Sequence, residues 1–72
     1  MDYIDFVTKM APIKPLLNGD GKSIAERLGV PYSTYQNYIK NIASDPDLRQ
    51  RMYDTCVQWL EEKRQKIENV LN

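Results

Sequence analysis

The chain contains 72 residues, with ten basic and ten acidic side chains and therefore no formal net charge. A domain of this size buries only about 60% of the surface that its unfolded chain exposes, so its core is small and a deep cleft between two domains is excluded. Hydrophobic residues make up 42% of the chain and charged residues 28%, a balance typical of a globular protein. The zero net charge also means that the strongly basic character of many nucleic-acid-binding domains is missing.

Histidine is absent and Cys56 is the only cysteine, so the sequence lacks the residues for a His-dependent nucleophile pair, an internal disulfide or a cysteine-rich zinc site. We therefore expect no enzymatic activity, no cofactor and no metal. A single cysteine fits a reducing compartment, and no apolar run reaches the ~20 residues that cross a bilayer. The sequence thus favours a cytoplasmic protein in which Cys56 is buried and unreactive.

The first two segments are predicted to be short helices. Residues 2–10 carry apolar side chains at helical spacing, and Asp2 is placed to cap this helix. A second short helix is expected over residues 13–18, with Leu16 and Leu17 facing inward. A turn follows, because two glycines and an Asn-Gly pair occur within four residues, Asn18-Gly19-Asp20-Gly21.

Two further helices are predicted on either side of Gly29. The first covers residues 22–28, and Gly29 ends it because glycine readily adopts the left-handed conformation after a helix. Pro31 begins the second, which runs to about residue 41. The spacing of its side chains predicts an inner apolar stripe of Tyr35, Tyr38, Ile39 and Ile42, opposite an outer polar stripe of Ser33, Gln36, Asn37 and Lys40.

The last segment is predicted to be one long helix. Ser44-Asp45-Pro46 combines capping side chains with a proline in the first turn, and no proline or glycine follows up to Leu71. A helix over these 26 residues would be ~39 Å long. The sequence therefore predicts an all-α domain of four short helices and one long C-terminal helix.

The residues from Gly21 to Lys40 also form a specific pattern, Ile24-Ala25-x-x-Leu28-Gly29-Val30-x-x-Ser33-Thr34. This pattern resembles the helix-turn-helix of bacterial and phage repressors, Cro-like proteins and the DNA-binding ends of resolvases. It covers less than a third of the chain, and Tyr35 stands where that family usually has Val or Ile. The resemblance implies a helix-turn-helix DNA-binding unit over residues 1–45, completed into one domain by the helix over residues 46–72.

The resemblance further implies a sequence-specific protein that binds double-stranded DNA and reads the major groove with the helix over residues 31–41. The side chains that would contact base edges are Tyr32, Ser33, Gln36 and Asn37. Gln and Asn can each pair in bidentate fashion with adenine, and Ser can donate or accept a hydrogen bond. Their spacing independently places three of the four on the outer polar stripe.

Phosphate contacts are expected from Lys22, Thr34 and Lys40, and the helix after residue 45 could add Arg49 and Arg51. Between residues 13 and 43 there are four basic and two acidic side chains, a net charge of +2. Phosphate contacts supply much of the affinity of proteins for DNA. A single copy therefore offers few of them, and two copies would double the number.

A pairing surface is predicted on the long helix. Its apolar residues recur at alternating spacings of four and three, interrupted by Arg64, over about two and a half heptads. The expected dimerisation residues are Tyr53, Val57, Leu60, Ile67 and Leu71. We expect a homodimeric transcriptional regulator, a repressor, whose two copies read half-sites about one helical turn (~34 Å) apart.

Two other functions remain open from the sequence. The zero net charge and the apolar long helix also fit a protein-interaction or assembly module that keeps the helix-turn-helix shape without reading DNA. An intermediate possibility is a DNA packaging or recombination accessory protein, which binds DNA inside a larger ring or complex. Salt dependence separates DNA binding from apolar assembly, and the size of the oligomer separates a repressor dimer from a packaging ring.

Overall fold

The computed structural model describes residues 1–71, with side chains up to Val70. Helix α1 spans Tyr3–Met10, the 3-10 helix η1 spans Lys14–Leu17, α2 spans Gly21–Leu28, α3 spans Tyr32–Ile39 and α4 spans Pro46–Leu71. All these elements are helical, so the predicted all-α class is confirmed. The second of the four predicted short helices is a single 3-10 turn of four residues.

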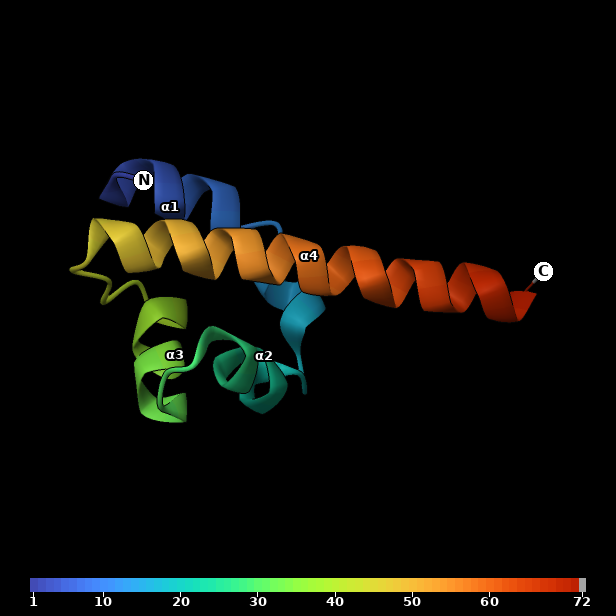
Figure 1. Cartoon of the computed structure of the whole chain (residues 1–72). Helices are drawn as coiled ribbons and strands as arrows, with labels where there is room; N and C mark the ends of the chain where they lie inside the picture. Colours follow the sequence, from blue (N-terminus) through green and yellow to red (C-terminus); the bar gives the residue numbers. More distant parts are fainter. Residues whose placement is uncertain (72) are drawn as a thin grey trace.

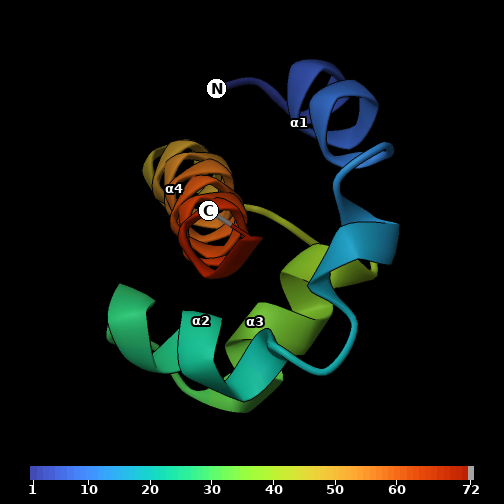
Figure 2. The same ribbon diagram turned by 90° about the vertical axis from the view of Figure 1, so that its right-hand side faces the viewer.

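Helix α4 is the element on which the other helices pack. Helix α1 lies along the first half of α4, while α2 packs on another side of α4 and also on α3 (Figure 1). Seen along α4, the shorter elements surround only part of its circumference (Figure 2). The C-terminal part of α4 continues beyond the other helices, so α4 has a covered first half and a projecting end.

The predicted helix boundaries are set by local capping interactions. Asp2 Oδ1 accepts a hydrogen bond from the Asp5 N–H at 2.8 Å and so caps α1. Asp45 Oδ1 accepts from the Asp47 N–H at 2.9 Å, directly before α4. Gly29 ends α2 with a φ of +74°, and the N–H of Val30 donates back to the Ala25 carbonyl. These start and stop signals were all present in the sequence.

Three sequence expectations about the short elements are wrong. Helix α3 begins after Pro31 and ends at Ile39, two residues early, because Asn41 adopts a left-handed φ of +66°. The chain therefore leaves the helical path before Ile42, which is 65% exposed rather than part of the inner stripe. In η1 a 3-10 helix has three residues per turn, so only Leu17 faces the core and Leu16 is 59% exposed.

The core lies between α4 and the short helices. Its fully buried side chains come from α1, α2 and α4 and are Phe6, Met10, Ile24, Met52 and Cys56. Burial raises the pKa of the Cys56 thiol to about 12, so this side chain stays neutral, as expected for an unreactive cysteine. Phe6 meets the ring of Tyr38 edge to face, with 6.1 Å between centroids, which joins α1 to α3.

Gly21 lets the first turn of α2 approach α3 closely. A Cβ atom at this position would lie 2.7 Å from Cε1 of Tyr35 and 3.1 Å from Cε1 of Tyr32. The two tyrosine rings are stacked on each other, with 5.9 Å between centroids. A side chain at residue 21 would therefore displace a packed pair of rings at the start of α3.

We expect Gly21→Ala to lower the free energy of unfolding by about 1–3 kcal/mol, because overpacking forces the Tyr35 ring to move. The change occurs although alanine is favoured over glycine in a helix by about 1 kcal/mol. Chemical denaturation followed by circular dichroism measures it. Ser23→Ala, at an exposed position two residues later, is the control and should change stability little. A Gly21→Ala variant as stable as the parent chain would contradict this account of the contact.

Candidate nucleic-acid interface

The outer stripe of α3 is open. Ser33, Gln36, Asn37 and Lys40 are all exposed, and Tyr32, at the start of the same helix, is 40% exposed. Within residues 1–70, none of these five side chains has a hydrogen-bond partner elsewhere in the chain. The four residues predicted to contact bases therefore lie together on one short helix, with their polar groups unoccupied.

The inner face of α3 holds the helix in place. Tyr35 and Tyr38 are each only 6% exposed, and the Tyr38 hydroxyl accepts a hydrogen bond from the Asp45 N–H at 3.3 Å. Burial raises the pKa of Tyr35 to about 12, so its phenol remains neutral. Because α3 is attached through this face, its exposed outer stripe lies on the side of the helix opposite the core.

A groove of about 540 Å³ lies beside the start of α3, bounded by η1 and the turn before α2. Two lysines line it. Lys22 Nζ lies 5.9 Å from the centre of the Tyr32 ring, and Lys14 Nζ donates to Asn41 Oδ1 at 2.7 Å. Partial burial lowers the pKa of Lys14. This edge of the candidate interface thus carries the ammonium groups of Lys14 and Lys22 next to the rings of Tyr32 and Tyr35.

The predicted phosphate-contacting residues do not all lie on this surface. Lys22 and Lys40 are exposed. Thr34 is half-buried and lines an internal gap with Leu48 and Met52 of α4, so it is turned away from the outer stripe.

The two arginines that were expected to add phosphate contacts, Arg49 and Arg51, both donate to backbone carbonyls of this chain. Arg49 is buried and donates to the Ala43 carbonyl at 2.6 Å and to the Met1 carbonyl at 2.9 Å. Arg51 donates to the Leu28 carbonyl at 2.7 Å, at the end of α2. The expectation for Arg49 is therefore wrong, because its buried guanidinium is bound to backbone carbonyls, whereas Arg51 stays exposed and binds a carbonyl through one of its nitrogens.

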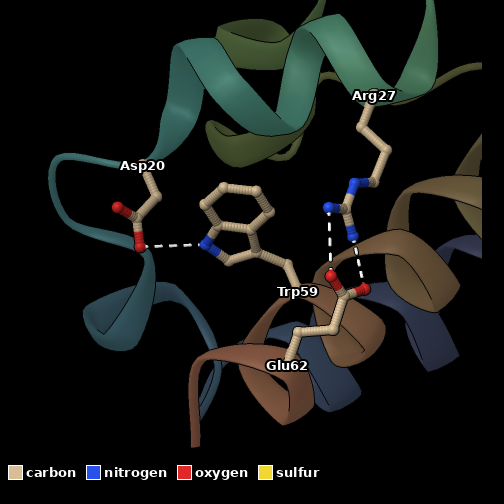
Figure 3. Close-up of polar contacts among 4 residues, drawn as sticks. All are labelled: Asp20, Arg27, Trp59 and Glu62. Carbon is tan, nitrogen blue, oxygen red and sulfur yellow. Dashed lines mark hydrogen bonds and ion pairs between the residues drawn. The ribbon is translucent and has the colours of Figure 1, made fainter. Parts of the chain in front are cut away.

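Four side chains fasten α2 to α4, and we call them the α2–α4 clasp: Asp20, Arg27, Trp59 and Glu62 (Figure 3). Arg27 forms a two-pronged ion pair with Glu62, at 2.6 and 3.2 Å. The Trp59 indole N–H donates to Asp20 Oδ2 at 3.0 Å, and the Arg27 guanidinium lies 5.0 Å from the Trp59 ring. The clasp fixes the position of α2, and through it of α3, along α4.

Electrostatics lowers the pKa of both acids in the clasp. Lys63 donates to Asp20 at 2.9 Å, and this hydrogen bond, with that of Trp59, lowers the pKa of Asp20. The hydrogen bond from Arg27 lowers the pKa of Glu62. Because its carboxylate is directed to α4, Asp20 makes no side-chain cap to α2, although it precedes that helix. Sequence reasoning missed the clasp, since its partners lie 35 to 43 residues apart and carry no local pattern.

The predicted dimerisation residues divide into two groups. Tyr53 and Leu60 are half-buried against the chain's own core, and Lys9 Nζ of α1 lies 5.8 Å from the centre of the Tyr53 ring. Val57 and Ile67 are 41% and 55% exposed. The side chain of Leu71 lies outside the described residues. Only the later part of the predicted seam is therefore free on the surface.

Comparisons with protein-family models, with curated proteins and with solved structures find no significant match to this chain. Among the described residues, no helix has both the length and the hydrophobicity that spanning a bilayer requires. The same part of the chain contains no cluster of three or more Cys, Asp or Glu side chains arranged to hold a metal ion. The geometry of α3 and its surroundings is therefore the basis for a functional proposal.

The clasp predicts a loss of stability in acid. The folded-state pKa values of Asp20 and Glu62 lie below their ordinary values, so these carboxylates stabilise the fold at neutral pH, and this contribution disappears as the pH falls through the lowered values. We expect the free energy of unfolding to decrease from about pH 6 to about pH 3, and to decrease less in the double variant Asp20→Asn, Glu62→Gln. Glu26→Gln removes an exposed acid outside the clasp and should leave the acid dependence steep. Identical pH profiles for the double variant and the parent chain would show that the clasp contributes nothing.

Proposed function

We propose that the protein binds double-stranded DNA in a sequence-specific manner and that α3 enters the major groove. The observation that carries this proposal is the outer stripe of α3, a row of exposed polar side chains without partners in the described chain. An α-helix fits the major groove, and the N-terminal residues of such a helix reach the base edges. In this proposal α2, the residues from Gly29 to Pro31 and α3 form the helix-turn-helix that the sequence resembles.

The chemistry of the stripe matches that of base edges. Gln36 and Asn37 carry amides that can donate to and accept from an adenine at the same time, and Ser33 can add one hydrogen bond. The Tyr32 ring stacks on Tyr35, which reduces the rotational freedom of this side chain at the start of α3. A thymine methyl or a sugar is a suitable partner for such a ring. These four side chains act as the base-reading set in the proposal.

Lys22 and Lys40 would hold phosphates at the edges of the stripe. Lys14 lines the protein groove beside the start of α3, together with Lys22. The first N–H groups of α2 have no side-chain cap, because the Asp20 carboxylate is bound to Trp59 and Lys63. Uncapped N–H groups at the positive end of a helix favour an anion. The clasp therefore supports the proposal in two ways. It orients α2, and it holds the Asp20 carboxylate against α4 instead of against the N-terminus of α2.

The proposed role of the protein is transcriptional regulation, with repression by occupation of a promoter. A single copy has only about three lysines for phosphate contacts, which gives weak binding at physiological salt. Two copies bound to adjacent half-sites would double these contacts and the number of bases that are read. The proposal therefore includes a homodimer.

Selection from random duplexes followed by gel-shift titration tests the base-reading set. We expect a preferred sequence to be enriched, and the double variant Gln36→Ala, Asn37→Ala to bind it at least tenfold more weakly, since each bidentate pair contributes about 1–3 kcal/mol of discrimination. Gln58→Ala, Gln65→Ala removes two exposed amides from α4 and is the matched control. Equal binding by both double variants, or no enriched sequence, would refute the proposed role of α3.

The lysines should act differently from the amides. Lys40→Ala should weaken binding to all duplexes by a similar factor and reduce the slope of log affinity against log salt by about 1, because one phosphate contact is lost. Titrations at several salt concentrations give this slope. Lys66→Ala removes an exposed lysine from the projecting end of α4 and should leave the slope unchanged.

An assembly module is the second candidate, and the observation in its favour is the set of exposed apolar side chains on η1 and α4, which includes Leu16, Val57 and Ile67. Apolar association holds or strengthens as salt rises, whereas DNA binding weakens steeply. Molar mass measured over a salt series, with and without duplex DNA, therefore separates the two functions. A large ring rather than a dimer would favour a packaging role.

A further inference from the structure

From Val57 onward, α4 carries a largely apolar strip, which we call the α4 seam: Val57, Leu60, Arg64 and Ile67. Ile13 and Leu16 form the opposite wall of a groove of about 550 Å³ along this seam. Leu16, Val57 and Ile67 are each more than two-fifths exposed. Exposed apolar side chains gathered along one groove form a surface that another apolar surface can cover.

The same side of α4 is closed over its first half. Tyr53 continues the seam by one helical step, but its ring is half-buried and lies under Lys9 of α1. Figure 1 shows α1 along the first half of α4 and no element beside its last turns. A partner can therefore approach the seam only from about residue 57 onward.

We propose that the α4 seam binds the α4 seam of a second copy of this chain, with the two helices antiparallel. A second copy offers an identical apolar strip on an identical projecting helix. In a parallel pair, the α1 helices of both copies would lie between the two α4 helices and hold them apart. In an antiparallel pair, the projecting ends overlap and the two bodies lie at opposite ends, so α1 is no obstacle.

Charge also favours the antiparallel direction. Arg64 lies within the seam and pairs with Glu61 at 2.7 Å and Glu68 at 3.7 Å on its own helix. Lys63 is already bound to Asp20 and is not free to neutralise a partner's acids. A parallel pair in register would place Arg64 opposite its own counterpart. An antiparallel pair places Arg64 near Leu60 and Glu61 of the other copy, where its stem covers apolar surface and its guanidinium meets a carboxylate.

This inference rests on the proposed function only for the role of the dimer, which is to bring two α3 helices to one DNA site. It is tested without DNA. If the chain is monomeric yet selects a DNA sequence through Gln36 and Asn37, the pairing proposal fails and the proposed function stands. If the chain is an antiparallel dimer that selects no sequence, the proposed function fails and the pairing stands.

The first measurement is molar mass by sedimentation equilibrium over a range of concentrations. We expect a monomer–dimer equilibrium whose dissociation constant rises at least tenfold in Ile67→Asp, because a charge enters the seam. Ile42→Asp is the matched control, since Ile42 is 65% exposed against 55% for Ile67 but lies in the loop after α3, and this substitution should leave the dissociation constant unchanged. A monomer at every concentration, or equal effects of the two substitutions, would overturn the proposal.

The second measurement fixes the direction of the helices. Spin labels attached at Gln50→Cys and, separately, at Gln65→Cys report the distance between equivalent residues of the two copies. In an antiparallel pair that crosses near residues 62–65, we expect the labels at residue 50 to lie about 25 Å or more farther apart than those at residue 65, at 1.5 Å per residue. Similar distances at both positions would identify a parallel pair and overturn the proposal. Cys56 is fully buried, so the unsubstituted chain should take up no label.

Discussion

The packing of short helices against α4 is the constraint on which the rest of the structure depends. Helices α1, α2 and α3 have eight residues each, and isolated helices of this length are marginal in water. Each is stabilised by burying one face in a core to which α4 contributes Met52 and Cys56. Only one face of α3 is needed for this packing. The opposite face, which carries the polar stripe, is therefore not required to stabilise the fold.

Charge is distributed unevenly over this neutral chain. Arg49 and Arg51 bind backbone carbonyls, and Arg27 and Lys63 bind carboxylates between α2 and α4. These cations stabilise the fold and lie away from the outer stripe. Lys22, by contrast, stays exposed beside the start of α3. Among residues 1–70, four of the ten acids pair with Arg27, Lys63 and Arg64 in the region of α2 and α4, so part of the charge that balances the chain is engaged away from α3.

The parts of the fold that could be predicted from the sequence are those encoded within a few residues. Asp2 and Gly29 act on their own helix ends, so the boundaries they set were predicted correctly. The exposure of the stripe was predicted from helical spacing, which holds for any helix that packs on one face. The placement of Ile42 on the inner stripe was wrong because Asn41 ends α3 early. The clasp was not predicted because its partners are far apart in the sequence. Sequence spacing also could not show that Lys9 of α1 lies over Tyr53 and so removes the first residue of the predicted seam from the free surface.

Helix α4 joins the two proposed surfaces in one rigid element. Its first turns lie beneath α3, with Leu48 and Met52 next to Thr34, and Trp59 and Glu62 hold α2 through the clasp, while Val57 to Ile67 carry the seam. Because α4 is one continuous helix, the way in which two copies pair at the seam determines the separation and the relative orientation of their α3 helices. If both proposals hold, the spacing of the DNA half-sites is a property of α4 rather than of the base-reading residues. Substitutions in the seam would then alter which spacing is bound, and substitutions at Gln36 and Asn37 would alter which bases are read.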